Sequence, residues 1–263
     1  GSWLHVQQFE RRRELPSGLL DDLPVRLAER FGLPASQVIL KQRQRQRGTL
    51  QYEKTGRTAP SFTVRERGLR FEVNLGRYLD TGLFPDHRET RRWVGEHTAG
   101  KTLLNLFAYT GSFTVYAAAG DARRTVTVDM SRTYQDWSRR NLVHNRLDDR
   151  TRHHFVQADV LTFIERMAAE KARFDLVVLD PPSFSNSKRM QATFDVQRDH
   201  PDLLRKTLGL LAPGGTLVFS NNRQGFRLDP AIASLANVEE ATHWTVPADF
   251  SRHQPHRCWL LSV

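Results

Sequence analysis

The sequence predicts an α/β fold: a mostly parallel sheet that ends in an antiparallel strand pair, preceded by a small α+β appendage. From about residue 100 onward, strand-like apolar runs alternate with helical stretches, which is the pattern of parallel strands joined by right-handed crossovers. The last two strand-like runs are joined by a loop without a full helix, so they are expected to be antiparallel. Before residue 80, short elements alternate with basic clusters. We therefore expect an appendage over residues 1–80 and a larger domain over residues 81–263.

The larger domain is expected to contain five parallel strands with helices between them. The expected parallel strands are Thr102–Phe107, Arg124–Asp129, His154–Gln157, Phe174–Asp180 and Gly215–Ser220. The expected helices are Ser112–Ala119, Ser131–Asn145, Val160–Ala172 and Asp195–Leu211. The antiparallel pair is expected at Val238–Thr245 and Arg257–Val263.

The appendage is expected to combine one amphipathic helix with short strands. Leu19–Phe31 carries leucines at helical spacing, and Gln37–Arg47 begins as an apolar strand. Phe62–Val64 and Leu69–Leu75 are strand-like, with Arg67-Gly68 as the turn between them.

A row of arginines follows the apolar start of the Gln37–Arg47 strand. Arg43, Arg45 and Arg47 alternate along it, so a strand places them on one face. Such a row suits contact with a phosphate backbone, and it also suits a solvated edge that resists aggregation. The charge of the whole chain favours RNA binding.

Composition narrows the classes of partner. The net charge is +10 and the isoelectric point about 10.3, which favours a polyanion such as nucleic acid or an acidic membrane surface. No apolar run approaches the roughly 18 residues of a membrane span, and the first residues do not form a signal-peptide core. The single cysteine, Cys258, excludes an internal disulfide framework, and the ten histidines show no metal-ligand spacing. We expect a cytoplasmic protein without a catalytic metal.

The ends of the first two predicted parallel strands carry a nucleotide-like pattern. Gly111 permits a tight turn after the first strand, and the helix beginning near Ser112 points its amides to the same place. Alone, one glycine is equally an ordinary strand–helix turn. Asp129 ends the second strand 18 residues later, a spacing at which an acid accepts both ribose hydroxyls. The alternative for Asp129 is a helix N-cap.

The third and fourth strands each end in an acid as well. Asp159 can accept the exocyclic amine of adenine while Val160 packs on the ring, or Asp159 can cap the next helix. Asp180-Pro181-Pro182-Ser183-Phe184 follows the fourth strand, and its two prolines make the turn rigid. Asp180 and the proline carbonyls can accept hydrogen bonds from a ligand amine. Phe184 offers a face on which a base can stack.

These motifs resemble class I S-adenosylmethionine-dependent methyltransferases, in which the Asp-Pro-Pro turn marks members that methylate nucleic-acid bases. The match narrows to the C-terminal, guanine-N7 half of the bacterial bifunctional large-subunit (23S) ribosomal RNA methyltransferases. The segments that carry it are Leu79–Arg88, Asn105–Gly111, Val128–Ser131, Asp180–Lys188, Phe194–His200 and Phe219–Asn222. The other half of such two-headed proteins, a guanine-N2 methyltransferase with its own RNA-binding module, is not in this sequence. The chain is therefore expected to be an excised half or a stand-alone relative.

The resemblance implies a role for each site residue. The methionine end of S-adenosylmethionine would be lined by Asn105, Phe107, Tyr109, Thr110 and Gly111. Asp129 and Met130 would hold its ribose and adenine, and Asp159 and Val160 the adenine edge. Arg88 would reach over from the segment before the first strand, while Asp180, Pro181 and Pro182 would face the methyl group and the target base. Lys188 and Arg189, beside the mouth of the site, would contact RNA together with Phe184.

The expected chemistry needs alignment more than proton transfer. Guanine N7 has a free lone pair and attacks a sulfonium methyl without a general base, and Asp180 would stabilise the charge that the ring gains. From the residues alone, an exocyclic amine is an equally suitable target. Cytosine C5 is not, because that reaction needs a cysteine nucleophile near the Asp-Pro-Pro turn or the next strand, and Cys258 is expected to be a buried apolar residue.

Three other functions share part of this pattern. An NAD-dependent oxidoreductase shares the glycine turn and the acid after the second strand, but not the Asp-Pro-Pro turn or the antiparallel end. A non-catalytic RNA-binding module would be expected to lose the cofactor acids, yet Asp129, Asp159 and Asp180 are all present. The third possibility is a methyltransferase half that binds its cofactor but needs a covalently linked second half to engage RNA.

Overall fold

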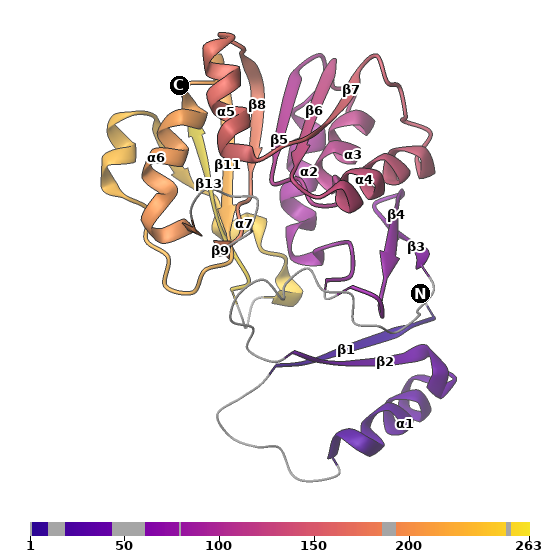
Figure 1. Cartoon of the computed structure of the whole chain (residues 1–263). Helices are drawn as coiled ribbons and strands as arrows, with labels where there is room; N and C mark the ends of the chain where they lie inside the picture. Colours follow the sequence, from indigo (N-terminus) through magenta and orange to yellow (C-terminus); the bar gives the residue numbers. More distant parts are fainter. Residues whose placement is uncertain (1, 10–18, 44–60, 79, 186–192, 251–253) are drawn as a thin grey trace. The chain divides into compact units, whose positions relative to one another are not determined.

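The structure, a computed structural model, describes residues 2–9, 19–43, 61–78, 80–185, 193–250 and 254–263 (Figure 1). The chain forms two compact units, which we describe separately. The first unit comprises residues 1–64 and 73–81, and the second comprises residues 65–72 and 82–263.

The first unit contains a short parallel strand pair and a helix. β1 (Leu4–Phe9) pairs with β2 (Val38–Arg43), and α1 (Leu19–Phe31) and the 3-10 turn η1 (Ala35–Gln37) precede β2. The helix has the predicted bounds. The predicted strand, by contrast, begins only at Val38, because the residues before it form the 3-10 turn. β1 was not predicted at all: its mixed polar and apolar residues give no clean alternation.

A β-hairpin, β3 (Ser61–Glu66) and β4 (Leu69–Asn74), turns at Arg67 and Gly68 as expected. Both turn residues have positive φ, 48° at Arg67 and 85° at Gly68, which is the geometry of the primed hairpin turns. The tip of this hairpin, residues 65–72, belongs to the second unit.

The second unit is a three-layer α/β/α domain around a seven-stranded sheet in the order β12-β13-β11-β8-β5-β6-β7 (Figure 1). All neighbouring strands are parallel except β13, which is antiparallel to both β11 and β12. The strands are β5 (Thr102–Leu106), β6 (Arg124–Asp129), β7 (His153–Gln157), β8 (Phe174–Leu179), β11 (Leu211–Asn221), β12 (Asn237–Glu240) and β13 (Arg257–Ser262). The predicted mostly parallel sheet with an antiparallel end is confirmed.

Each face of the sheet packs on its own helices, because alternate residues of a strand point to opposite faces. One core contains Leu104 and Leu106 of β5 with residues of α5 and α6; the other contains Leu103 with residues of α2 and α3. The helices are α2 (Arg88–Glu96), α3 (Ser112–Ala119), α4 (Arg132–His144), α5 (Val160–Ala169), α6 (Val196–Leu208) and the single turn α7 (Thr242–Thr245).

Two segments differ from the prediction in a way that matters for the site. The predicted strand Val238–Thr245 is wrong in its second half: the chain leaves the sheet after Glu240, and Thr242–Thr245 forms α7. The Thr242 hydroxyl accepts the Cys258 N–H at the point where the backbone turns out of the sheet. α2, which was not predicted, is preceded by the 3-10 turn η3 (Pro85–His87); its many arginines masked the helical periodicity.

The parallel strands β5, β6, β7, β8 and β11 bring their carboxyl ends to one edge of the sheet, where ligands of open α/β sheets bind. In register, Leu106 lies between Val128 and Leu179, and Leu179 pairs with Phe219. The residues that follow these strands are therefore neighbours across the edge. Within the described residues, no helix is long and apolar enough to span a membrane.

Candidate functional site

The loop between β5 and α3 is held in an unusual backbone conformation. Phe107, Tyr109 and Gly111 have φ values of 54°, 50° and 69°. Positive φ is costly for a side chain other than glycine, and such residues concentrate at ligand sites, where the surrounding structure must hold them. The loop ends at Gly111, the N-cap of α3, which supplies no side-chain cap to the first amides of the helix. Those amides point toward the edge of the sheet and suit an anionic group.

Gly111 is required by its surroundings as well as by its φ. A Cβ at this position would lie 2.7 Å from both Cβ and Oγ of Ser138 on α4. The Ser138 hydroxyl also donates to the Tyr109 carbonyl at 3.1 Å. The close approach that the glycine allows is thus to α4, and it fixes the loop against that helix.

Two further loop residues are anchored by their side chains. The buried Thr110 donates through Oγ1 to the Gly82 carbonyl at 2.6 Å, which ties the loop to the segment before α2. The ring of Tyr109 lies 4.6 Å from Tyr134 and 5.3 Å from Phe84, between ring centroids. The rings of Phe84, Tyr109 and Tyr134 therefore form an aromatic cluster at the loop.

Asp129 lies at the end of β6, next to this loop. One carboxylate oxygen accepts the Tyr109 N–H at 2.9 Å, and the other accepts the Ser131 N–H at 2.8 Å. Burial raises the pKa of Asp129 to about 6, although these two backbone hydrogen bonds act to lower the pKa. Each carboxylate oxygen can accept a second hydrogen bond, so the backbone contacts are compatible with ribose hydroxyls. The N-cap of α4 is Ser131, not Asp129.

The ends of β6 and β7 provide the rest of the predicted adenine site. Asp159 is the N-cap of α5 and accepts the Thr162 N–H at 3.0 Å, so the capping role considered from the sequence is confirmed. Val160 is buried, and the Met130 carbonyl accepts a hydrogen bond from Gln157. Gln135 donates to the carbonyls of Thr127, Asp129 and Val156, which holds the two strand ends together.

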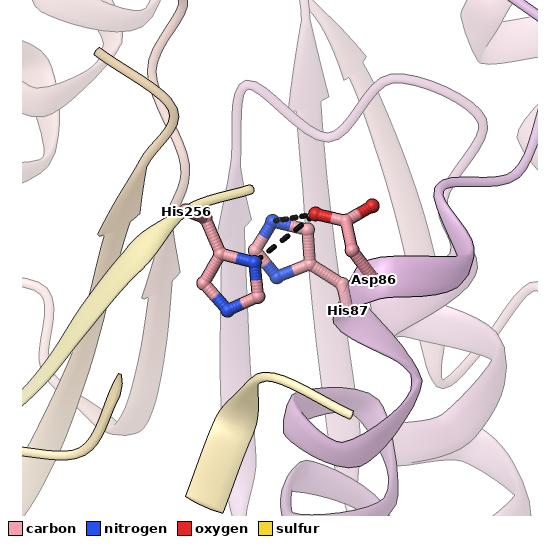
Figure 2. Close-up of side chains that lie close together, drawn as sticks. All are labelled: Asp86, His87 and His256. Carbon is pink, nitrogen blue, oxygen red and sulfur yellow. Dashed lines mark hydrogen bonds and ion pairs between the residues drawn. The ribbon is translucent and has the colours of Figure 1, made fainter. Parts of the chain in front are cut away.

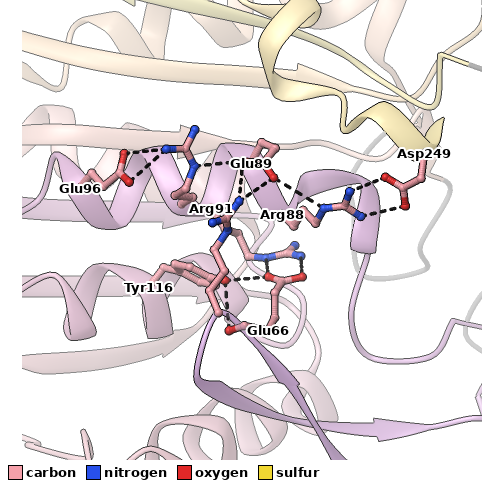
Figure 3. A network of polar contacts seen from close by, with 9 residues as sticks. Glu66, Arg88, Glu89, Arg91, Glu96, Tyr116 and Asp249 are labelled. Carbon is pink, nitrogen blue, oxygen red and sulfur yellow. Dashed lines mark hydrogen bonds and ion pairs between the residues drawn. The ribbon is translucent and has the colours of Figure 1, made fainter. Parts of the chain in front are cut away.

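Two predicted cofactor residues have other partners in the structure. Asn105 is only 1% exposed and donates to the Thr114 hydroxyl at 3.1 Å, inside the layer between β5 and α3. Arg88 forms a two-pronged ion pair with Asp249 at the start of α2 (Figure 3). Asn105 therefore supports the β5–α3 loop through its contact with Thr114. Arg88 would have to release Asp249 to contact a cofactor.

The Asp-Pro-Pro turn is fixed at both ends. Ser220, on the neighbouring strand β11, donates to Asp180 Oδ1 at 2.7 Å, and the Ser183 hydroxyl donates to Asn222 Oδ1 at 2.6 Å. Phe184 then enters a two-stranded ladder, β9 (Phe184–Ser185) with β10 (Phe194–Asp195), and its side chain is 48% exposed. The predicted stacking role requires an exposed ring, and the Phe184 ring is exposed. Pro181 is buried and Pro182 half-buried.

Asp86, His87 and His256 form a cluster (Figure 2). Asp180 faces this cluster. Its Oδ2 is 3.6 Å from His87 Nε2. The His256 ring stacks on the His87 ring at 4.1 Å between centroids, and its Nδ1 is 3.0 Å from Asp86 Oδ2. Burial raises the pKa of Asp180 to about 6 and, with the neighbouring His256, lowers the pKa of His87 to about 3. His87 is therefore neutral at physiological pH.

The same three residues could be considered as metal ligands, since one donor atom from each lies within 4.8 Å of the others. The near-parallel rings, 12° apart, argue against shared coordination. Ring nitrogens donate in the plane of the ring, and two stacked planes do not converge on one ion. Hydrogen bonding accounts for the contact between His256 and Asp86. Although burial acts to raise the pKa of Asp86, this hydrogen bond and the two histidines hold that pKa below its usual value.

A buried ion pair supports the segment that carries Asp86 and His87. Arg91 is 1% exposed, and its guanidinium binds both carboxylate oxygens of Glu66 at 2.8 Å (Figure 3). It also donates to the Phe84 carbonyl at 2.9 Å, one residue before η3. Tyr116 adds a hydrogen bond to Glu66 at 2.9 Å, and burial raises the pKa of its phenol. The start of η3 is thereby fixed from inside the domain.

The predicted RNA-binding residues are mostly outside the described part of the chain. Arg45, Arg47, Lys188 and Arg189 lie there, and Arg43 is the last residue of β2, of whose side chain nothing is described. Phe184 alone among these residues is placed with its side chain.

Sequence reasoning assigned no role to Asp86, His87, His256, Ser220 or Asn221. Ser220 and Asn221 could have been found, because they end the fifth parallel strand, and ligands of such sheets bind beyond the strand ends. His256 could not, since only the tertiary fold brings it to residues 86 and 87.

Comparison with known proteins identifies the class first. A family model described as S-adenosylmethionine-dependent methyltransferase matches residues 28–252, and the chain belongs to this family. The structure of the methyltransferase SMU.776 complexed with SAH has the same fold, with a TM-score of 0.75 and 24% identity, over 93% of this chain and 66% of that one. These matches also rule out the oxidoreductase alternative.

Within that class the chain belongs with the ribosomal RNA large subunit methyltransferases K. It is 47% identical to the K enzyme of Neisseria meningitidis over 98% of this chain and 74% of that protein. It is equally identical to the K/L protein of Allochromatium vinosum, again over 98% of this chain. The resemblance stated from sequence motifs is confirmed. The chain spans only 36% of that K/L protein.

The described residues fit the cofactor that this family implies. The strained β5–α3 loop, the uncapped amides of α3 and the buried Asp129 carboxylate lie together at the carboxyl edge of the sheet. The anion-binding amides match the methionine carboxylate of S-adenosylmethionine. The Asp129 carboxylate matches the ribose hydroxyls.

Proposed function

We propose that this chain transfers a methyl group from S-adenosylmethionine to N7 of a guanine in large-subunit ribosomal RNA. The observation that carries the proposal is the Asp180 carboxylate at the end of β8. Ser220 holds one of its oxygens, and the other faces the His87–His256 cluster beside the β5–α3 loop. The RNA substrate is inferred from the K and K/L relatives, whose names specify the ribosomal large subunit.

On the cofactor side, Asp129 accepts the ribose hydroxyls, and Asp159 and Val160 bound the adenine. The β5–α3 loop with Phe107 and Tyr109 positions the methionine portion, whose carboxylate meets the first amides of α3 at Gly111 and Ser112. S-adenosylmethionine supplies an electrophilic sulfonium methyl group. The domain has to align that group with the target atom, and such alignment can contribute roughly 7–11 kcal/mol to lowering the barrier.

On the target side, no proton has to leave. The N7 lone pair forms the new bond to carbon, the carbon–sulfur bond breaks, and its electron pair stays on sulfur. The guanine ring becomes cationic as the sulfonium becomes neutral. A preorganised carboxylate is the group that stabilises such a charge, and Asp180 is held by Ser220 before the reaction begins.

The base has to leave its helix to reach this edge of the sheet, so base flipping accompanies methylation. Phe184, exposed beside the turn, provides a stacking face worth roughly 1–3 kcal/mol. The basic residues Arg43, Arg45, Arg47, Lys188 and Arg189 are proposed to contact phosphates. Residues 1–80 are then a basic, RNA-contacting appendage to the methyltransferase domain 81–263, and a cytoplasmic location follows from the substrate.

An exocyclic amine is the second candidate target, and one observation favours it. Burial raises the pKa of the Asp180 carboxyl to about 6, which lets this carboxylate accept a proton near neutral pH. Methylation of an amine releases a proton, whereas methylation of N7 does not. Asp180 would take up that proton.

The test uses the purified chain, S-adenosylmethionine with a labelled methyl group, and unmodified large-subunit ribosomal RNA transcript. The RNA is digested to nucleosides, and mass spectrometry locates the label. We expect 7-methylguanosine, and we expect Asp180→Ala to lose the label while cofactor binding persists by calorimetry. Label on N2 of guanine would replace the N7 assignment by the amine. No label with intact cofactor binding would mean that this chain needs a linked second half to engage RNA.

A further inference from the structure

A small polar pocket adjoins the Asp-Pro-Pro turn on the side away from β6 and β7. It has a volume of about 180 Å³ and lies between the residues that follow β11 and those that precede β13. Its lining includes Asn221, Asn222, Arg223, Gln224, Gln254 and His256. Pockets for drug-sized ligands are larger, roughly 300–1,000 Å³, so this one suits a single base.

The pocket is connected to Asp180 at three points. Asn221 directly follows Ser220, which donates to Asp180. Asn222 accepts a hydrogen bond from Ser183, two residues beyond Pro181. His256 forms both a wall of the pocket and a part of the cluster that faces Asp180.

Asn221 is one of the residues that line the pocket, and its side-chain amide donor is unsatisfied. Its side chain is 1% exposed, and its Oδ1 accepts the Arg223 N–H at 3.1 Å, which fixes which end of the amide is oxygen. Its Nδ2 has no hydrogen-bond partner among the residues that the structure describes. A buried donor without a partner destabilises the folded state, so a ligand acceptor that reached it would recover that free energy.

The arginines of the pocket are already neutralised. Arg223 pairs with Asp195 at 2.5 Å, and Arg257 pairs with Glu240 at 2.8 Å. A phosphate site would need uncompensated positive charge. The pocket therefore suits an uncharged, hydrogen-bonding group such as the edge of a base.

We propose that this pocket receives the target guanine and that Asn221 Nδ2 donates to its O6. The proposal rests on the proposed function and extends it to the choice of base. Guanine presents two acceptors, N7 and O6, on one edge. N7 must stay open to the methyl donor, which leaves O6 for Asn221. Adenine carries an amino donor in place of O6, so two donors would face each other and adenine would be rejected.

The proposal is tested by NMR titration of the full chain saturated with S-adenosylhomocysteine. The side-chain amide signals of Asn221 are identified as the pair lost in Asn221→Asp. We expect these signals to shift with guanosine and inosine monophosphates, which both carry O6, and not with adenosine or 2-aminopurine ribonucleoside monophosphates, which lack it. An equal response to adenosine monophosphate, or none to guanosine monophosphate, would overturn the assignment.

Variants provide the second measurement. Asn221→Asp replaces the donor by an acceptor, and we expect kcat/KM for ribosomal RNA to fall about 10- to 100-fold with the affinity for S-adenosylhomocysteine unchanged. Asn237→Asp, an exposed residue of β12, makes the same charge change away from the pocket and should leave kcat/KM as it is. If both variants behave alike, Asn221 does not read the base.

The outcome can be separated from that of the proposed function. Selective response of Asn221 to O6 ligands, with the label found on N2 in the RNA assay, would retain the base pocket and exclude N7 as the target. Label on N7 without a response from Asn221 would retain the reaction and exclude the pocket as its guanine site.

Discussion

The two halves of the sheet's carboxyl edge are built by different means. On the β5–β6–β7 side, the polar groups that line the edge bind backbone: Asp129 accepts two main-chain amides, and Asp159 caps a helix. On the β8–β11–β13 side, side chain binds side chain, as in the contacts Ser220–Asp180 and His256–Asp86. The acids on the β5–β6–β7 side can be recognised from the local sequence pattern. The contacts on the β8–β11–β13 side form only when segments distant in the sequence come together.

This difference agrees with what each half is proposed to bind. A cofactor shared by a whole family can be held by features common to the fold, such as a helix N-terminus and a strand-end carboxylate. A target base distinguishes one member from another, and its recognition depends on particular side chains.

The largest expected effect is a loss of stability in the contacts that support Asp86 and His87, next to the proposed site of the target base. Glu66→Gln leaves the buried Arg91 guanidinium without an anionic partner, and removing one member of a buried pair costs about 3–5 kcal/mol. The free energy of unfolding, measured in urea, should fall by that amount. Glu96→Gln removes an exposed partner of Arg92 in the same network and should cost under about 1 kcal/mol (Figure 3). Equal losses in the two variants would show that the buried pair gives no special support.

The next largest effect is on cofactor affinity, and it tests whether separate sides of the edge bind the cofactor and the target base. Asp129→Ala removes the proposed acceptor of both ribose hydroxyls, and two hydrogen bonds to a charged group are worth roughly 3 kcal/mol or more. Calorimetry should show the Kd for S-adenosylhomocysteine rising about 100-fold or more. Asp180→Ala should change this Kd less than about tenfold, because Asp180 is proposed to act mainly on the base. If both variants weaken binding equally, the division of the edge into two halves is wrong.

The packing of the cofactor loop gives a smaller effect. Gly111→Ala introduces both a left-handed alanine and a clash with Ser138, for which we expect a loss of about 1–3 kcal/mol in stability. Ser138→Gly removes the clashing Cβ, so the double variant should be more stable than the sum of the single effects predicts. Thermal unfolding of the four proteins measures this. Strict additivity would mean that the backbone conformation, and not contact with α4, requires the glycine.

The smallest expected effect is a dependence of rate on pH. The pKa of Asp180 is raised to about 6, so the carboxylate that stabilises the cationic base is lost as the pH falls through that value. With saturating cofactor, methyl transfer should fall about tenfold per pH unit below 6. Asp180→Asn should show a low rate without this dependence.

The same pKa shift has the opposite sign for stability. A carboxyl group with a raised pKa favours the folded state fully below its unfolded value, near 3.8, and that contribution is lost as the pH rises through about 6. Asp180→Asn should therefore gain stability relative to the unmodified chain at pH 7 and not at pH 4.

Sequence alone predicted the sheet and the acids at its strand ends, because both depend on local patterns. The strand-ending acids Asp129, Asp159 and Asp180 stand where parallel strands must bring them together. α2 and the buried Arg91 were missed, since arginine normally indicates a solvated helix face and its burial here depends on Glu66 from the β3–β4 hairpin. The hydrogen bond from Asn105 to Thr114 was not predicted either, because it joins β5 to α3 and depends on how the two elements pack.

The position of β13 in the sheet has a consequence for synthesis. β13 follows every other strand of the domain in the sequence, yet it lies between β11 and β12. A nascent chain can close the β7-to-β11 part of the sheet first, but it cannot join β12 until β13 has emerged from the ribosome. His256 arrives with it. The pocket proposed for the base is therefore completed only after the strands that carry the proposed cofactor residues.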